Sequence, residues 1–230
     1  MNSSGLYSEL LFGVSVTIIA YICALLIRRK FRWLHPLVTA PILIYTLLLT
    51  GEIDYSYYEA GGELVTFFLG PATVALAVPL YKHAIRLKDH LPHLIAGALV
   101  GSAAGLVLNA LSILLLNGSK EMLLSALPKS VTTAVAVDLT RWLGGTPELT
   151  AALTALTGLF GSLIGPPLLR LAGVRGAIAA ALAIGAASHG IGSARLLADS
   201  EEMGGVSSFS MAACAVFTPL LLLPLHLLIL

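Results

Sequence analysis

The chain has 230 residues, of which 57% are hydrophobic and 11% are charged, and its formal net charge is +1. The mean hydropathy of +0.93 excludes a soluble globular domain, because a domain of this length could not hide so much apolar surface from water. The near-neutral charge disfavours nucleic-acid binding. The composition therefore predicts an all-α integral membrane protein that lies in the lipid bilayer.

Seven or eight apolar segments approach the length of a membrane helix, which needs roughly 20 apolar residues to cross a core about 30 Å thick. The first segment ends in the basic run 28–32 rather than in a small-residue cleavage site, so we expect a retained span and not a signal peptide. Short connections predict a single polytopic domain over residues 1–230. The segments are residues 8–27, 35–51, 63–81, 92–116, 122–140, 149–170, 176–196 and 207–230.

Positive charge in short loops predicts the orientation of the spans. The basic run 28–32 and the basic connection 82–90 are expected in the cytoplasm, which places the N-terminus outside. If every segment crosses, Arg170 and Arg175 lie on the outer side. A re-entrant or broken hairpin over residues 122–140 returns both arginines to the cytoplasm, and this is the topology that we prefer.

The strings LGPATVALAV and LPKSVTTAVAV indicate an internal repeat. They align Pro71 with Pro128 and Thr73 with Ser130, at an offset of 57 residues (128 − 71) that continues downstream without gaps. Chance similarity is the alternative, but a shared proline followed by a hydroxyl residue favours two interrupted helices, a feature of transporter binding sites. The predicted parts are N-terminal spans 1–51, repeats 63–118 and 120–172, and C-terminal spans 176–230.

Lys129 is an ionisable residue in a segment where charge is costly. It follows the helix-breaking Pro128 and precedes the hydroxyl residues Ser130, Thr132 and Thr133. If a half-helix begins here, its free N–H groups, the hydroxyls and the ammonium together form an anion site. The alternative is a lysine that reaches the headgroups while the hydroxyls bond to the preceding turn.

The string GAASHGIGSAR places Ser188 and His189 among glycines and ends at Arg195. The glycines allow close packing or an unwound helix, so the imidazole could bond a substrate or carry a proton. Alternatively, His189 bonds a neighbouring carbonyl for packing alone. Arg195 either contributes to function or pairs with Asp199 one turn later. Asp138 is interpreted as an interfacial anchor.

Enzyme motifs are absent from the sequence: there is no GxSxG, Walker loop, HExxH or cluster of His, Asp and Glu ligands. Cys23 and Cys214 lie far apart without CxxC spacing and are interpreted as small packing residues. We therefore expect no catalytic residue, no cofactor and no metal site. The polar residues are suited to binding and release.

Four motifs in this order, GPATVALAVPLYKH, LPKSVTTAVAV, LTGLFGSLIGPPLLR and ASHGIGSAR, resemble the LrgB/CidB family of bacterial inner-membrane proteins. The resemblance extends from about Leu37 to the C-terminal region. One position departs from the family pattern, since Ala134 stands where a second proline is expected. This leaves open how sharply the helix is broken after Thr133.

The resemblance implies a multi-pass inner-membrane protein with one of two functions. Bacterial members are described as holin- or antiholin-like proteins that modulate murein hydrolase activity and cell lysis with a smaller LrgA/CidA-type membrane partner. The plant relative looks like a plastid glycolate/glycerate exchanger, and some bacterial relatives are linked to pyruvate uptake. In the plant relative a segment like the small partner is fused ahead of this region, so a separate small partner is expected here.

The interrupted repeat and the Lys129 segment, together with what the resemblance implies, favour secondary transport of a small monocarboxylate such as glycolate, glycerate, lactate or pyruvate. The carboxylate would bind near Lys129, faced by the Pro71 and Thr73 break, while His189 bonds the hydroxyl or relays a proton. The alternatives are a holin-like lysis regulator that acts by assembly, and a scaffold for the small partner without transport of its own. Both a monomer and a homo-oligomer are compatible with the sequence.

Overall fold

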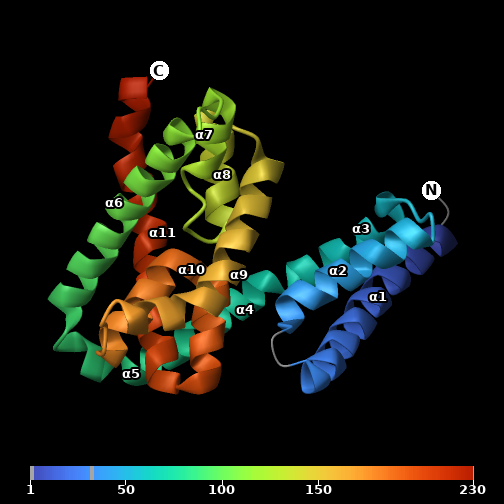
Figure 1. Cartoon of the computed structure of the whole chain (residues 1–230), viewed down its shortest axis with the longest axis horizontal. Helices are drawn as coiled ribbons and strands as arrows, with labels where there is room; N and C mark the ends of the chain where they lie inside the picture. The colour runs from blue at the N-terminus through green and yellow to red at the C-terminus, as the bar shows by residue number, and fades with distance from the viewer. Residues whose placement is uncertain (1–2, 32–33, 230) are drawn as a thin grey trace. The chain divides into compact units, whose positions relative to one another are not determined.

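The computed structural model describes residues 3–31 and 34–229, and every regular element in these ranges is a helix (Figure 1). Arg32 of the basic run and Leu230 of the last predicted segment lie outside the described residues. Six helical stretches are long and apolar enough to cross a membrane, and α2 is a shorter apolar helix. Each predicted segment overlaps a helix or a helix pair, which confirms the all-α membrane fold.

The chain divides into two compact units, residues 1–73 and 74–230. Two glycines bring α1 and α3 of the first unit together, since a Cβ atom on Gly61 would lie 2.5 Å from the Cα atom of Gly13. Asp54 caps α3, and hydrogen bonds from the hydroxyl and the N–H of Ser56 lower the pKa of its carboxyl group. The helices are α1 (Ser3–Lys30), α2 (Pro36–Thr50) and α3 (Tyr55–Phe67), and α4 (Leu69–Ala75) spans the division.

The second unit contains two long helices of equal length, α6 and α9, each followed by a hairpin. Both have 25 residues, and their first and last residues are 56 positions apart (147 − 91 and 171 − 115). The same spacing of 56 relates their buried faces, Leu94, Ala98, Ser102 and Leu106 in α6 and Thr150, Thr154, Gly158 and Ser162 in α9. The helices are α5 (Ala77–Lys88), α6 (Leu91–Leu115), α7 (Lys120–Ala126), α8 (Thr133–Leu143), α9 (Pro147–Leu171), α10 (Ala177–Asp199) and α11 (Glu201–Ile229).

The predicted segment 122–140 is broken into two short helices, α7 and α8, by the turn 127–132. Pro128 lies in this turn, where a residue without an N–H cannot continue α7. The two arms run back beside each other, because the N–H of Thr146, just after α8, donates to the Ser125 hydroxyl of α7 at 2.8 Å. The broken hairpin expected from charge and from Pro128 is therefore present.

The helix α10 also turns back on itself, at His189, where the backbone has φ 41° and ψ −134°. A Cβ atom on Gly192 would lie 3.3 Å from the carbonyl oxygen of Ile184, eight residues earlier, which a straight helix does not allow. Residues from both ends line one cavity of about 440 Å³: Gly176, Ala177, Ile178, Ser200, Glu202, Met203 and Val206. A straight helix would separate these ends by roughly 33 Å. The candidate segment 176–196 is therefore not one straight helix, since it is interrupted at His189, where the glycines of the sequence allow an unwound helix.

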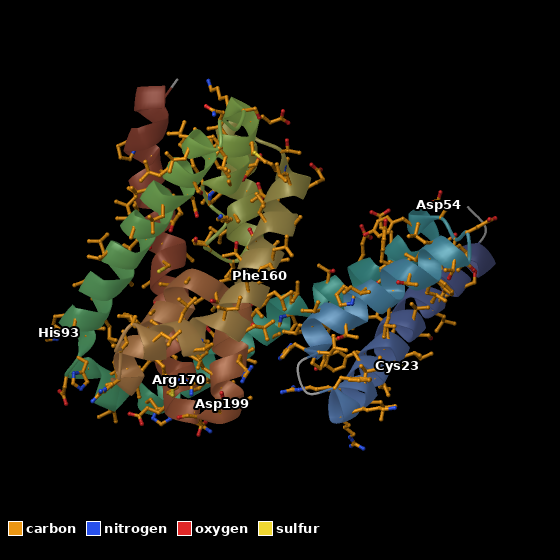
Figure 2. All side chains as sticks on the ribbon, in the orientation of Figure 1. Cys23, Asp54, His93, Phe160, Arg170 and Asp199 are labelled. Atoms are coloured by element: carbon orange, nitrogen blue, oxygen red, sulfur yellow. The ribbon has the colours of Figure 1, made fainter. Side chains whose placement is uncertain are left out.

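The two hairpins point toward each other from opposite ends of the second unit. Along α6, Gly101 lies against α10, and Asn109 contacts the turn 127–132 two turns later. Along α9 the order is reversed, since Thr150 contacts α7 and Gly161 contacts α10. Figure 1 shows α7 and α5 at opposite ends of this unit, and Figure 2 shows Arg170 and Asp199 toward the end where α5 lies. Thus α6 and α9 are antiparallel, with both hairpin tips between them.

A re-entrant α10 predicts which connections share a side of the membrane. In a background of Cys23→Ser and Cys214→Ser, we expect Arg175→Cys and Glu202→Cys to react with a membrane-impermeant thiol reagent from one side. Ser119→Cys, in the turn before α7, should react from the other side. All three native positions are exposed, so the reagent can reach them. Position 202 reacting together with position 119 would show that α10 crosses the membrane after all.

Candidate functional site

Lys129 lies at the tip of the α7–α8 hairpin and is half-buried. Its backbone N–H donates to the carbonyl oxygen of Ala126 at 3.3 Å. Within residues 3–31 and 34–229, its side-chain ammonium has no hydrogen-bond or ion-pair partner. A half-buried lysine at this hairpin tip therefore has no counter-charge among the described residues.

The N-cap residue of α8 lies three residues after Lys129. Thr132 is the N-cap residue, with extended backbone angles of φ −60° and ψ 145°, and its side chain makes no capping hydrogen bond. Thr133 is the first helical residue, and both threonines are half-buried. The N–H groups of the first turn of a helix have no intrahelical partner and carry partial positive charge. The helix begins sharply at Thr133 although Ala134 replaces the expected proline.

Asn109 of α6 is a polar residue of this site that sequence reasoning missed. It is 7% exposed, and its side-chain Nδ2 donates to the carbonyl oxygen of Leu127 at 3.1 Å. The same nitrogen lies 3.4 Å from the hydroxyl oxygen of Ser130. An amide in the apolar segment 92–116 is a signal that the sequence does contain, because polar side chains in hydrocarbon need partners. A criterion based on charge alone does not select this uncharged amide.

His189 forms the tip of the α10 hairpin and is 4% exposed. Its Nε2 lies 3.0 Å from the carbonyl oxygen of Thr154 on α9. A carbonyl can only accept, so Nε2 carries the proton and Nδ1 of the neutral ring is left as an acceptor. The adjacent Ser188 is fully buried, and its hydroxyl has no hydrogen-bond partner in the described part of the chain. The Nε2 atom of His189 therefore serves packing. Its Nδ1 atom and the Ser188 hydroxyl are two further polar groups at this tip.

The two tips lie about one helical turn apart along α6. A Cβ atom on Gly101 would be 3.1 Å from Cβ of Ala186, which precedes the α10 tip. A Cβ atom on Gly105, one turn further, would be 3.5 Å from the Ser130 hydroxyl oxygen. One turn of a helix rises 5.4 Å. The Lys129 and His189 segments thus occupy neighbouring layers along α6.

Arg195 lies apart from these tips. It is six residues after His189, roughly 9 Å along the second arm of α10, and its guanidinium pairs with Asp199 at 3.6 Å. This is the structural alternative that the sequence left open. Similarly, Asp138 pairs with Arg141 at 3.2 Å on an exposed surface, as an interfacial anchor would.

Pro71 and Thr73 lie in α4, in the first unit, and both are exposed. The helix break lies at Phe68 rather than at Gly70 and Pro71, because proline needs no N–H partner in the first turn of a helix. The Thr73 hydroxyl donates to the carbonyl oxygen of Leu69 at 2.7 Å. That this segment faces Lys129 stays a prediction, as does the equivalence of residues 63–118 and 120–172.

The pattern of the LrgB-like family matches residues 17–228. The chain belongs to the LrgB-like family. It is 34% identical to YxaC of Bacillus subtilis over 219 residues, which cover 93% of this chain and 95% of that protein. It is equally 34% identical to the holin-like protein CidB of Staphylococcus aureus over 218 residues, 94% of this chain and 95% of CidB. No solved structure matches the chain. The resemblance found in the motifs is thereby confirmed, and this LrgB-like chain is a multi-pass membrane protein.

Proposed function

We propose that this LrgB-like protein is a secondary transporter of small monocarboxylates such as glycolate, glycerate, lactate or pyruvate. The observation that carries the proposal is the half-buried Lys129 ammonium without a partner among the described residues. A charge removed from water is costly unless a counter-charge accompanies it. A substrate carboxylate supplies that charge, together with acceptor oxygens for the hydroxyls of Ser130 and Thr132 and for the N–H groups of α8.

The opposed hairpins support transport rather than binding alone. Transporters of several folds bind substrate near the membrane midplane, where interrupted helices from inverted repeats meet. Here α6 with its hairpin and α9 with its hairpin are antiparallel and related by 56 positions. In the proposed site His189 bonds the 2-hydroxyl group of a hydroxy acid or relays a proton, and Ser188 lies beside it.

Uptake into proteoliposomes tests the proposal. Purified protein should take up radiolabelled glycolate with saturation, and unlabelled lactate and pyruvate should compete. Empty liposomes, and proteoliposomes given a labelled sugar of similar size, serve as controls. Uptake that rises linearly with glycolate concentration and ignores competitors would reject carboxylate transport.

The name of the relative CidB, a holin-like protein, favours a second candidate function. In that case the chain would assemble in the membrane, with a small LrgA/CidA-type protein as its partner, and would modulate murein hydrolases and lysis. Leakage from liposomes that increases steeply with protein concentration and passes unrelated dyes would support this candidate. Activity that appears only when the small protein is added would instead indicate a scaffold role.

A further inference from the structure

We infer that Asn109 is a positioning residue of the carboxylate site, acting through Ser130 and Leu127. The inference rests on the proposed function. Asn109 does not belong to either hairpin. It reaches the α7–α8 turn from α6, where it contacts the Leu127 carbonyl oxygen at 3.1 Å and the Ser130 hydroxyl oxygen at 3.4 Å.

The orientation of the Asn109 amide follows from its partner. The Leu127 carbonyl oxygen can only accept a hydrogen bond, so the amide atom that faces it has to be the nitrogen. The amide nitrogen carries two protons, and the second is available to the Ser130 hydroxyl oxygen. The bond to Ser130 is long, whereas the bond to Leu127 has ordinary length.

The first bond removes a repulsive group from the site. Leu127 is the C-cap residue of α7, so its carbonyl belongs to the end of a helix that carries partial negative charge. An unbonded carbonyl at this tip would repel a carboxylate bound by Lys129 two residues later. By donating to that oxygen, Asn109 offsets part of the negative charge at the end of α7 and so lowers its repulsion of an anion near Lys129.

The second bond directs the Ser130 hydroxyl. A hydroxyl whose oxygen accepts from Asn109 keeps its own proton free to donate elsewhere, and a carboxylate is the acceptor that the site would supply. Gly105 packs beside this hydroxyl, since a Cβ atom there would be in ordinary contact with the Ser130 oxygen, at 3.5 Å. Asn109 thereby prepares a donor without touching the ligand.

A double-mutant cycle on glycolate binding tests this inference. Purified wild-type protein, Asn109→Leu, Ser130→Ala and the double variant are compared by calorimetric titration with glycolate. We expect each single variant to weaken the affinity about tenfold, and the double variant to be far less than a hundredfold weaker, because residues that act through one another are not additive. Additive losses would overturn the action through Ser130, and unchanged affinity in Asn109→Leu would overturn the role of Asn109 altogether.

Two further variants separate positioning from folding. Asn109→Asp keeps the shape of the side chain but places an acceptor against the Leu127 carbonyl. It should therefore weaken glycolate binding at least as much as Asn109→Leu. This variant keeps the test valid if leucine at position 109 disturbs folding. Thr157→Val on α9 is the matched control, since that hydroxyl bonds only within its own helix, to Leu153 at 2.7 Å, and binding should be unchanged. Retained binding in Asn109→Asp would reject the inference, whereas absence of glycolate binding by the wild-type protein would reject the proposed function itself.

Discussion

Lys129→Ala is expected to abolish saturable glycolate uptake, and to do so without destabilising the protein. The ammonium contributes a charge-assisted contact of about 2–3 kcal/mol to a bound carboxylate, equivalent to roughly a hundredfold in affinity. Because it has no partner in the described part of the chain, its removal breaks no intramolecular bond. Uptake and thermal unfolding, measured on the same preparation, check both parts of the prediction.

Two other lysine variants make this result specific. Lys129→Arg should retain part of the uptake, since the charge is kept while the donor geometry changes. Lys82→Ala removes a lysine that pairs with Glu201 at the surface, and its uptake should remain close to wild type. Equal uptake by Lys129→Ala and wild-type protein would remove Lys129 from the site.

Gly161→Ala is expected to displace the α10 tip and to lower both stability and uptake. The added Cβ atom would lie 1.9 Å from the hydroxyl oxygen of Ser188 and 2.9 Å from its Cβ atom. Overpacking of this kind costs about 1–3 kcal/mol when the surroundings have to shift. Thermal unfolding in detergent and uptake into proteoliposomes measure the two effects.

The cause of this loss can be isolated within the same pair of helices. Adding Ser188→Gly to Gly161→Ala removes the obstructing side chain and should restore much of the stability, although uptake stays reduced if Ser188 contributes to the site. Gly70→Ala is the matched control, because nothing lies within 4 Å of a Cβ atom there. Unchanged unfolding of Gly161→Ala would mean that α10 is not packed against α9 as described.

Hydropathy located the helices because membrane spans have a length and a composition that few other segments share. The break at Pro128 was predictable for a chemical reason, since proline removes a backbone donor and clashes with the preceding turn. The reversal of α10 at His189 was not predictable in this way. Two short arms of α10 have the same mean hydropathy as one full span, and a turn made by a single residue leaves only flanking glycines as its signal.

The candidate binding residues also divide into those that the sequence predicts and those that it does not. Charge in an apolar segment pointed to Lys129, and the structure leaves its ammonium without a partner among the described residues. Asn109 carries no charge and was overlooked, although its amide bonds the turn beside that lysine. The bounds and buried faces of α6 and α9 are 56 positions apart, whereas the sequence match that pairs Pro71 with Pro128 has an offset of 57, and the repeat of residues 63–118 in 120–172 stays a prediction.

The combination of one long helix with a returning hairpin has a consequence for how the chain is inserted. Such a block crosses the bilayer an odd number of times. A second block placed directly after the first therefore has the inverted orientation in the membrane. The α6 block recurs at α9, 56 positions later. Tandem order alone therefore makes the two halves antiparallel. Each face of the membrane then meets the same scaffold of one long helix and one hairpin.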